Sequence, residues 1–467
     1  MLTYNINKND KTPIYMQIYN FIKADITGGV ISHGERLPSK RSLAENLDVS
    51  VITVENAYSQ LMSEGYIESK EKKGYFACKV EIIERQISHI EAAEEPLKQR
   101  DENYINLSRN SVSAEDFPFS TWSKIVRKIL SERDEELLKR QSYKGNITIR
   151  KAIADYLRQF KAIDVSYEQI IIGGGTENLY PMPGNILGKD LVIGIENPGY
   201  YKIDKIYKYN HIPYCNIEMD SRGISIESLR NSSANILHLS PSHHFPSGIT
   251  TPIGRRTEIL NWCYEEKNRY IIEDDYDSEF RFNSKPIPSL YSIDCNNRVI
   301  YMNTFSKSVS PAIRIGYMVL PENLLKRADE IFGFMSSSVS VLEQLTMAEF
   351  INGGYFERHI NKMSKVYKGK RDMIVGYIKK YFNSGDFKIL EKNAGLHFVL
   401  NLKTELRDEL IKKKALENGV KLSFLSEFYK GVDDKAKHNL LIAYTGIEPE
   451  ETEKAIKILS DIFYGKC

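Results

Sequence analysis

The stretch from Asn303 to Gly316 constrains this chain more than any other. It follows an apolar run, Val299 to Met302, that predicts a buried strand leading into a loop. Lys307 lies in that loop among small hydroxyl residues, and Arg314 follows ahead of a second apolar run; the hydroxyl residues are Thr304, Ser306, Ser308 and Ser310. Hydroxyls and a guanidinium can hold a phosphate while a lysine amine bonds an aldehyde, as in sites for pyridoxal phosphate (PLP). A solvated loop lysine is the alternative, and the motif alone leaves both readings open.

An acidic stretch from Tyr270 to Arg281 lies upstream of this lysine. Its apolar first half predicts another strand, and the acids begin at the carboxyl end of that strand, where open α/β sheets bind their ligands. PLP needs an acid against its pyridine nitrogen, because the protonated ring is the electron sink, and a hydroxyl near its phenolic oxygen helps tune the Schiff base. Asp274 and Tyr276 are the candidates for these roles. A solvated acidic loop is the alternative, and the serine-flanked lysine that follows argues against it.

A third segment supplies a candidate phosphate cradle. The apolar run from Gln169 to Ile172 predicts a buried strand that enters a glycine-rich turn, Gly173 to Asn178, before a helix. Glycine-rich backbone at the start of a helix binds phosphate readily, although a lone glycine triplet is a weak signal. Combined with the hydroxyls and the arginine of the lysine loop, the turn predicts a phosphate site in which Gly175 and Thr176, rather than Glu177, make the contacts.

The first 79 residues predict three short helices and a hairpin. Pro13 begins the first helix, Ser39 and Ser50 cap the second and third, and two short strands flank a basic turn at residues 69–73. Helix, short turn, helix is the signature of many DNA-binding proteins, although structural modules without DNA also match it. Basic and outward-facing residues lie where phosphates and groove edges would be, so we expect DNA contacts from Lys40, Arg41, Ser50, Ile52, Thr53, Asn56, Lys72, Lys73 and Gly74.

Net charge does not decide the partner. The 467 residues carry a net charge of +2, and residues 1–79 hold 10 Lys and Arg against 9 Asp and Glu. The placement of the basic residues therefore carries the DNA-binding prediction. The five cysteines include no C-x-x-C pair, and the sequence has neither an apolar signal core nor a stretch of about twenty apolar residues. We therefore expect a soluble cytoplasmic protein with reduced thiols and no membrane partner.

The chain divides into three parts. Residues 80–104 carry 7 acids and 3 bases and too few apolar residues for a core of their own, which predicts a charged linker. Predicted strands and helices alternate from Ile105 onward, as an α/β domain requires. We therefore expect a winged-helix DNA-binding domain at 1–79, a linker at 80–104 and a PLP-binding α/β domain at 105–467, which the family resemblance described next implies is an effector domain.

The lysine loop and the acidic stretch resemble those of fold-type I aminotransferases, and especially of the MocR (GabR-like) branch of bacterial GntR regulators. The sequence G-E-R-L-P-S-K-R-S-L-A, at residues 34–44, is similar to the GntR winged helix. Glu196 to Tyr200, E-N-P-G-Y, resembles the turn whose tyrosine lies beside the cofactor ring, and Asn393 to His397 resembles a landmark of the small C-terminal lobe. The similarity covers almost the whole chain.

This resemblance implies a fold, a cofactor and a function. The fold is α/β: an N-terminal winged helix-turn-helix, then a fold-type I PLP-dependent aminotransferase-like domain with a large α/β part and a small C-terminal α+β lobe. Lys307 would anchor PLP, Asp274 would contact its ring nitrogen and Arg314 would clamp its phosphate, with Tyr200 beside the ring. The function is transcriptional regulation by a homodimer on a repeated or palindromic operator, with an amine, an amino acid or PLP as effector.

Three of this chain's departures from the family pattern bear on DNA binding, the cofactor and the effector. Val51 replaces an arginine that often begins the recognition helix, and with Ile52 it favours an operator richer in A·T. Phe245 replaces an asparagine found near the phenolic oxygen in many true aminotransferases. Leu441 stands where a late strand usually carries the arginine that grips a substrate carboxylate, and Lys202 would orient a carboxylate poorly. We therefore expect weak binding of simple amino acids, slow or absent transamination, and an effector that is PLP or an amine without a carboxylate.

Two alternative functions and one alternative site are also compatible with the sequence. A working aminotransferase with an accessory winged helix would reveal itself by turnover of amino donors with a keto acid. A DNA-binding scaffold with a decayed pocket would lack the absorbance of bound PLP. His243 and His244 suggest a metal, but no partner ligands lie at suitable spacing, so we expect a loop pair near the cofactor and no metal site.

Overall fold

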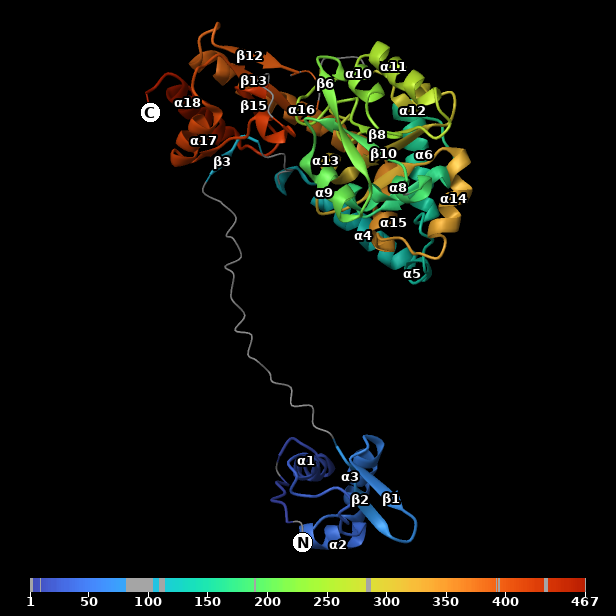
Figure 1. Ribbon diagram of the computed structural model, residues 1–467. Helices are drawn as coiled ribbons and strands as arrows, with labels where there is room; N and C mark the ends of the chain where they lie inside the picture. The colour runs from blue at the N-terminus through green and yellow to red at the C-terminus, as the bar shows by residue number, and fades with distance from the viewer. Residues whose placement is uncertain are drawn as a thin grey trace. The chain divides into compact units, whose positions relative to one another are not determined.

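The computed structural model consists of two compact units, Met1–Gln99 and Arg100–Cys467 (Figure 1). The structure describes residues 3–8, 10–80, 104–108, 114–188, 190–282, 287–391, 393, 395–431 and 436–466. The predicted linker at 80–104 lies almost entirely outside the described residues, so the predicted domain boundaries stay predictions.

The first unit is a winged helix, as predicted. Its helices are α1 (Ile14–Thr27), α2 (Lys40–Leu47) and α3 (Val51–Ser63), and its antiparallel hairpin consists of β1 (Ile67–Lys70) and β2 (Gly74–Ala77). Ser39 and Ser50 cap α2 and α3, because their hydroxyls accept hydrogen bonds from amides one turn later in each helix. The apolar faces of the helices meet in one core that includes Ile18, Ile22, Leu43, Val54 and Leu61.

An eight-stranded sheet organises the described part of the second unit. Its order is β4-β11-β10-β9-β8-β5-β6-β7; β10, β9, β8, β5 and β6 run parallel, and β11 and β7 run antiparallel to their neighbours. The strands are β4 (Ile170–Gly173), β5 (Ile193–Asn197), β6 (Tyr214–Asp220), β7 (Gly223–Ile224), β8 (Ile236–Leu239), β9 (Tyr270–Asp274), β10 (Val299–Thr304) and β11 (Gly316–Val319).

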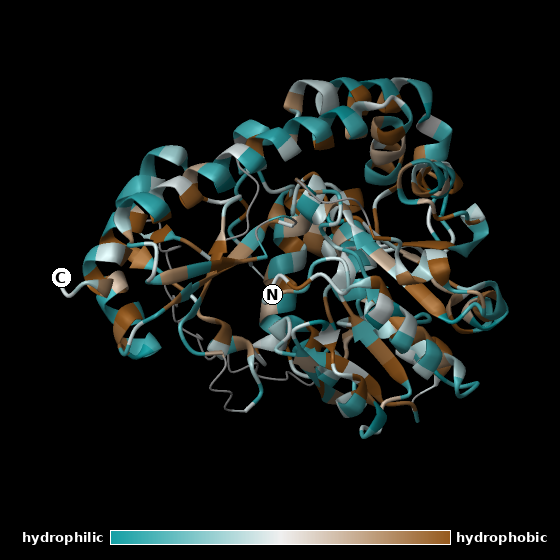
Figure 2. Cartoon of the chain, turned by 90° about the horizontal axis from the view of Figure 1, so that it is seen from above, coloured by the Kyte–Doolittle hydropathy of each residue, from teal (hydrophilic) through white to brown (hydrophobic). Residues whose placement is uncertain are grey.

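Alternate side chains of this sheet pack against opposite layers of helices, because successive residues of a strand point to opposite faces. Ile170 and Ile172 of β4 share a core with α4, α6 and α15, whereas Ile171 shares a core with α8, α9 and α14. In Figure 2 the strands are accordingly mainly hydrophobic, while the helices mix hydrophobic and hydrophilic residues. The helices are α4 (Phe119–Glu132), α6 (Ile147–Lys161), α8 (Pro181–Leu187), α9 (Tyr201–Tyr209), α14 (Glu322–Phe332) and α15 (Val341–Asn352).

The C-terminal part forms a smaller α+β lobe with its own core. An antiparallel sheet of β12 (Phe387–Leu390), β13 (His397–Leu402) and β15 (Asn439–Ala443) packs with α16 (Tyr355–Tyr381), α17 (Asp408–Glu417) and α18 (Pro449–Phe463). β14 (Val420–Lys421) pairs with β3 (Ile105–Asn106), so the start of the second unit returns to this lobe. A large α/β part and a small α+β lobe confirm the predicted fold class.

Short helices connect these elements. They are α5 (Asp134–Leu137), α7 (Thr176–Leu179), α10 (Ile226–Arg230), α12 (Leu290–Ile293) and α13 (Phe305–Ser308), with the longer α11 (Ile253–Tyr264) and 3-10 turns at Ala114–Asp116, Tyr167–Gln169 and Leu425–Phe428. Among the described residues, no helix combines the length and apolar character needed to cross a membrane.

Candidate functional site

Two neighbouring parallel strands bring the predicted cofactor residues to one edge of the sheet. β9 ends at Asp274 and β10 at Thr304, and Met302 of β10 is the register partner of Asp274. Lys307 lies in α13, the short helix that follows β10 directly. All nine residues predicted to contact the cofactor line one cavity of about 580 Å³: Gly175, Thr176, Tyr200, Asp274, Tyr276, Thr304, Ser306, Lys307 and Arg314.

Asp274 is buried at this edge with one oxygen unsatisfied. Its Oδ2 accepts a hydrogen bond from the Tyr180 hydroxyl at 2.6 Å, and Nε2 of His238 lies 3.9 Å from the same oxygen. Its Oδ1 has no hydrogen-bond partner among the described residues. A buried carboxylate oxygen without a partner is unfavourable, so this atom points to a ligand that donates a hydrogen bond. A protonated pyridine nitrogen is such a donor.

Burial shifts the pKa of Lys307 and that of Tyr276 in the directions that favour the predicted chemistry. Burial lowers the pKa of the half-buried Lys307, while Asp277 opposes this shift and Lys202 adds to it. A lowered pKa increases the share of neutral amine, the form that attacks an aldehyde. Burial also raises the pKa of Tyr276, so its hydroxyl keeps its proton and can donate it; this hydroxyl lies 3.4 Å from Nδ1 of His243.

Two turns build the predicted phosphate side of the cavity. The Thr304 hydroxyl accepts a hydrogen bond from the amide of Ser306 at 3.1 Å and lies 2.9 Å from the Ser306 hydroxyl. Gly175 has a φ of +86°, a left-handed value that favours glycine, and a Cβ there would lie 3.3 Å from the Arg314 guanidinium. A side chain at position 175 would therefore crowd the arginine, and glycine permits its close approach.

Glu177 contacts the same arginine. Nη2 of Arg314 donates to Oε2 of Glu177 at 2.7 Å and to the Gly174 carbonyl at 3.1 Å, and Nζ of Lys202 lies 3.1 Å from Oε1 of Glu177. Hydrogen bonds from Arg314 and Lys202 lower the pKa of Glu177, so its carboxylate stays ionised. The sequence predicted no phosphate contact from Glu177, whereas in the structure its carboxylate lies directly on Arg314, the predicted phosphate clamp.

Aromatic rings form one wall of the site. Tyr200 lines the cavity and packs edge-on against Phe245, with ring centroids 5.7 Å apart. Phe245 packs edge-on in turn against Phe428 and His397. Because Phe245 has no hydrogen-bonding group, its ring adds packing here and no polar contact.

Tyr180, His238 and Glu196 also line this cavity, although the sequence predicted no role for them. Burial raises the pKa of Glu196 to about 8, and its Oε2 accepts a hydrogen bond from the amide of Ser240 at 2.9 Å. The sequence held a signal for two of these residues, Tyr180 and His238. Tyr180 follows Thr176 by one helical turn, and His238 is a lone polar residue inside an apolar strand.

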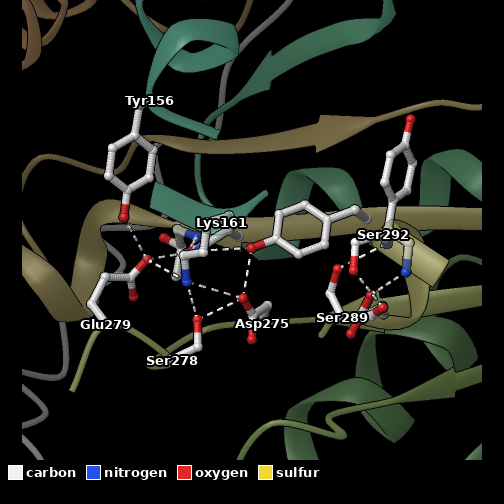
Figure 3. Close-up of polar contacts among 12 residues, drawn as sticks. Tyr156, Lys161, Asp275, Ser278, Glu279, Ser289 and Ser292 are labelled. Carbon is white, nitrogen blue, oxygen red and sulfur yellow. Dashed lines mark hydrogen bonds and ion pairs between the residues drawn. The ribbon is translucent and has the colours of Figure 1, made fainter. Parts of the chain in front are cut away.

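A buried polar network supports the ends of β9 and β10 (Figure 3). Nζ of Lys161, the last residue of α6, lies 3.2 Å from both Asp275 and Glu279. The Tyr301 hydroxyl donates to Asp275 at 2.6 Å, and the Asn303 amide donates to Glu279 at 3.1 Å. Burial on its own would raise the pKa of Asp275, but Lys161 and several hydroxyls hold it below its usual range. The network therefore ties α6 to both segments that carry the cofactor residues.

Most of the predicted DNA contacts are exposed on the first unit. Ile52 is 69% exposed on α3, and Asn56 is exposed one turn later. Arg41 on α2 and the hairpin-turn residues Lys72 and Lys73 are exposed as well. These side chains are therefore available to a DNA duplex, and their individual roles stay predictions.

Three of the predicted DNA contacts, Lys40, Ser50 and Thr53, already interact with other side chains of the winged helix. Nζ of Lys40 lies 2.5 Å from Glu55, so part of its charge is already neutralised. The Ser50 hydroxyl is 2.7 Å from the Thr53 hydroxyl and caps α3. Arg36, which the sequence analysis missed, lies beside the hairpin: a Cβ on Gly74 would be 3.3 Å from its Nε.

Comparison with known families identifies both units. The family Aminotransferase class I and II matches residues 102–459, and the family Bacterial regulatory proteins, gntR family, matches residues 14–76. The chain is 35% identical over 461 residues to the uncharacterized HTH-type transcriptional regulator YdeL of Bacillus subtilis, covering 98% of both chains. It is 27% identical to the probable rhizopine catabolism regulatory protein MocR of Rhizobium meliloti, over 98% of this chain and 95% of that one. It is 26% identical to the pyridoxine biosynthesis regulator PdxR of Corynebacterium glutamicum, over 91% of each.

Solved structures confirm the fold of the second unit. The kynurenine aminotransferase of Pyrococcus horikoshii superposes with a TM-score of 0.69 at 22% identity, covering 78% of this chain and 91% of that one. The multiple substrate aminotransferase of Thermococcus profundus gives the same TM-score at 23% identity, covering 78% and 92%. At these identities the likeness shows the fold.

A GntR winged helix followed by a class I and II aminotransferase domain defines a class of bacterial transcription regulators. The chain belongs to this class, the MocR-like GntR regulators. It is a DNA-binding transcriptional regulator whose larger domain binds pyridoxal phosphate. The described residues fit this cofactor, because Asp274 has a buried oxygen without a partner and a Cβ at Gly175 would fill the space against Arg314.

Proposed function

We propose that this protein binds an operator through its winged helix and that the cofactor site at Lys307 controls this binding. The observation that carries the proposal is the convergence in one cavity of the Lys307 amine, the Arg314 guanidinium and the unpartnered oxygen of Asp274. When bound, PLP supplies an aldehyde that reacts with amines and a ring that accepts electrons. Lys307 would hold the aldehyde, Asp274 the ring nitrogen, and Tyr276 the phenolic oxygen.

The phosphate of PLP would replace Glu177 as the partner of Arg314. Arg314 pairs with Glu177, and a phosphate is the stronger partner for a guanidinium because it carries more negative charge than a carboxylate. Lys202 would keep Glu177 neutralised after the exchange. Thr176 and Ser306 would complete the phosphate contacts with their hydroxyls and amides, beside the backbone of Gly175.

The effector is an amine without a carboxylate, or PLP itself. Leu441 is only 1% exposed in β15 and is not among the residues that line the cavity. Two lysines that do line it, Lys202 and Lys430, already pair with Glu177 and Asp204. Apart from the predicted phosphate clamp, no arginine is found among the described lining residues. An effector carboxylate would therefore be desolvated without a good partner, which is unfavourable.

Two exposed apolar side chains support a homodimer. Such a dimer would place two winged helices on a repeated operator. Leu138 and Phe334 are 88% and 77% exposed, and Arg140 links their segments by donating to the Phe334 carbonyl at 2.9 Å. Large exposed apolar side chains on two segments that contact each other are typical of subunit interfaces. Because a regulator must reach its operator, we propose that the protein acts in the cytoplasm.

The test combines absorbance with DNA binding. Purified protein is titrated with PLP and then with matched pairs of amines and their carboxylated counterparts, and its affinity for promoter DNA is measured at each step. We expect PLP absorbance tied to Lys307 and a change in DNA affinity with PLP or an amine, but not with the carboxylated counterpart. No absorbance change with PLP, or a DNA affinity indifferent to PLP and to every amine, would refute the proposal.

A working aminotransferase is the second candidate, because the site keeps the lysine, the aspartate and the tyrosine such an enzyme uses. Steady-state turnover of amino donors with a keto acid distinguishes the two. We expect slow or absent turnover, and we expect the substitution Leu441→Arg to strengthen amino-acid binding.

A further inference from the structure

A carboxylate of the short helix α7 lies on the predicted phosphate clamp and contacts two cations there. Oε2 of Glu177 lies 2.7 Å from Nη2 of Arg314, and Oε1 lies 3.1 Å from Nζ of Lys202. All three side chains line the cofactor cavity, and they come from α7, from α9 and from the segment before β11. Two cations that could bind a phosphate in this cavity are therefore already paired with a negative charge.

This carboxylate competes with a phosphate in two ways. Hydrogen bonds from Arg314 and Lys202 lower the pKa of Glu177, so the group is ionised near neutral pH. A phosphate that binds Arg314 must displace this carboxylate, and the displaced carboxylate, still beside Lys202, repels the negative charge of the phosphate. Both effects weaken the binding of a phosphate, and neither acts on a ligand without one.

The exposure of these contacts makes the competition reversible. The side chains of Glu177 and Lys202 are 43% exposed, and that of Arg314 is 53% exposed. Exposed ion pairs contribute little free energy, so a phosphate can exchange with the carboxylate. Arg314 has a second anchor during this exchange, because its Nη2 also donates to the carbonyl oxygen of Gly174 at 3.1 Å. Glu177 therefore weakens the site without closing it.

We propose that Glu177 is an internal competitor for the phosphate of PLP and sets the PLP concentration at which the protein responds. This inference rests on the proposed function, because it concerns the affinity of the same cofactor site. A weaker site fills gradually as the PLP concentration rises, so its occupancy can report the supply of the cofactor. Pyridoxal has the same ring and aldehyde but no phosphate, so its binding should be insensitive to Glu177.

The test measures the affinities of the cofactor-free, full-length protein for PLP and for pyridoxal by absorbance titration. Glu177→Gln keeps the size of the side chain but removes its charge. PLP should therefore bind roughly three- to tenfold more tightly, as expected from the loss of two exposed ion pairs, and pyridoxal affinity should not change. The matched control is Glu427→Gln: this carboxylate also lines the cavity but pairs with Lys412 at 2.7 Å, so PLP affinity should not change.

Two further readouts separate the contact with Arg314 from a general change in charge or structure. In the background of Arg314→Gln, the gain from Glu177→Gln should shrink, because the arginine that the carboxylate occupies is gone. In promoter binding, the PLP concentration at which DNA affinity is half changed should fall by the same factor as the dissociation constant of PLP. This second readout connects Glu177 to the response of the regulator as well as to the cofactor.

A second variant covers the case in which Glu177→Gln does not fold. Glu177→Ala removes the same carboxylate and introduces the residue that most favours a helix, so it should show the same gain in PLP affinity. An unchanged or weaker PLP affinity in the folded variants would overturn the inference, and so would an equal gain for pyridoxal or for Glu427→Gln. A wild type that shows no absorbance change with PLP would instead refute the proposed function, and this inference with it.

Discussion

The winged helix and the aminotransferase-like domain present their candidate ligand-contacting residues in opposite ways. Ile52 and Asn56 are exposed on one face of α3. Asp274 ends the buried strand β9, Lys307 lies in α13 directly after β10, and the polar network around Lys161 supports both segments. A substitution in the buried site should therefore disturb both ligand binding and stability, whereas one on the exposed face should change ligand binding alone.

The largest expected effect is at the lysine itself. Lys307→Ala removes the amine that bonds the cofactor's aldehyde, so borohydride treatment should no longer fix the cofactor to the peptide that contains residue 307. Mass spectrometry of the reduced, digested protein is the measurement. Lys202→Ala is the matched control, because it removes a neighbouring cavity lysine and should leave the fixation intact. A cofactor still fixed covalently in Lys307→Ala would show that a different lysine is the anchor.

The second largest effect should come from the network behind the site. Lys161→Met leaves the carboxylates of Asp275 and Glu279 buried without their cation, and breaking a buried ion pair in this way costs about 3–5 kcal/mol. Chemical unfolding of the second unit, followed by circular dichroism, measures the loss. Lys128→Met is the control, because its ion pair with Glu349 is exposed and should contribute little. Equal midpoints for the two variants would mean that the network is not coupled to stability.

Acid should remove from the wild type the stability that the ion pair of Lys161 with Asp275 contributes. The pKa of Asp275 is lower in the folded protein than its unfolded value of about 3.9, so its stabilising effect is present above that pH and is lost as the pH falls through the folded pKa. The difference between wild type and Lys161→Met should therefore shrink below about pH 4. A difference that stays constant down to pH 3 would contradict this account.

Local sequence patterns predicted the strands that carry the cofactor site and the helices that carry the candidate DNA contacts. Apolar runs marked β4, β9 and β10, and serines marked the starts of α2 and α3, because strand period and helix capping depend on residues close together in the sequence. The lysine, aspartate and arginine of the cofactor site followed from their positions at predicted strand ends, and the structure brings them together in one cavity.

What the sequence did not predict depends on contacts between distant segments. The bond from Tyr180 to Asp274 spans 94 residues, and the ion pair of Arg314 with Glu177 spans 137. The meeting of His243 with His397 requires β13 of the small lobe to reach the loop after β8. Strand register and lobe packing set these contacts, and no local spacing encodes either.

A smaller effect is expected at the ring-nitrogen partner. Asp274→Asn keeps the shape of the side chain but removes its charge, and losing one charge-assisted hydrogen bond costs about 1.5–3 kcal/mol, or roughly 10–150-fold in PLP affinity. Absorbance titration of cofactor-free protein gives the dissociation constant. Tyr180→Phe is the control, because it removes a hydrogen bond to Oδ2 and leaves Oδ1 in place, so its effect should be weaker. If Tyr180→Phe weakened PLP binding more than Asp274→Asn, Asp274 would not be the partner of the ring.

The smallest expected effect is at Arg41, on the exposed surface of the winged helix. Arg41→Ala removes one cation that can displace a counterion from DNA, so the slope of log affinity against log salt should fall by roughly one unit per DNA-binding unit. Stability should not change, because Arg41 is exposed on α2. Lys40→Ala provides a graded comparison: its ammonium already pairs with Glu55, so its removal should change the slope less than removal of Arg41 does. An Arg41→Ala slope equal to that of the wild type would place the DNA on another face of the winged helix.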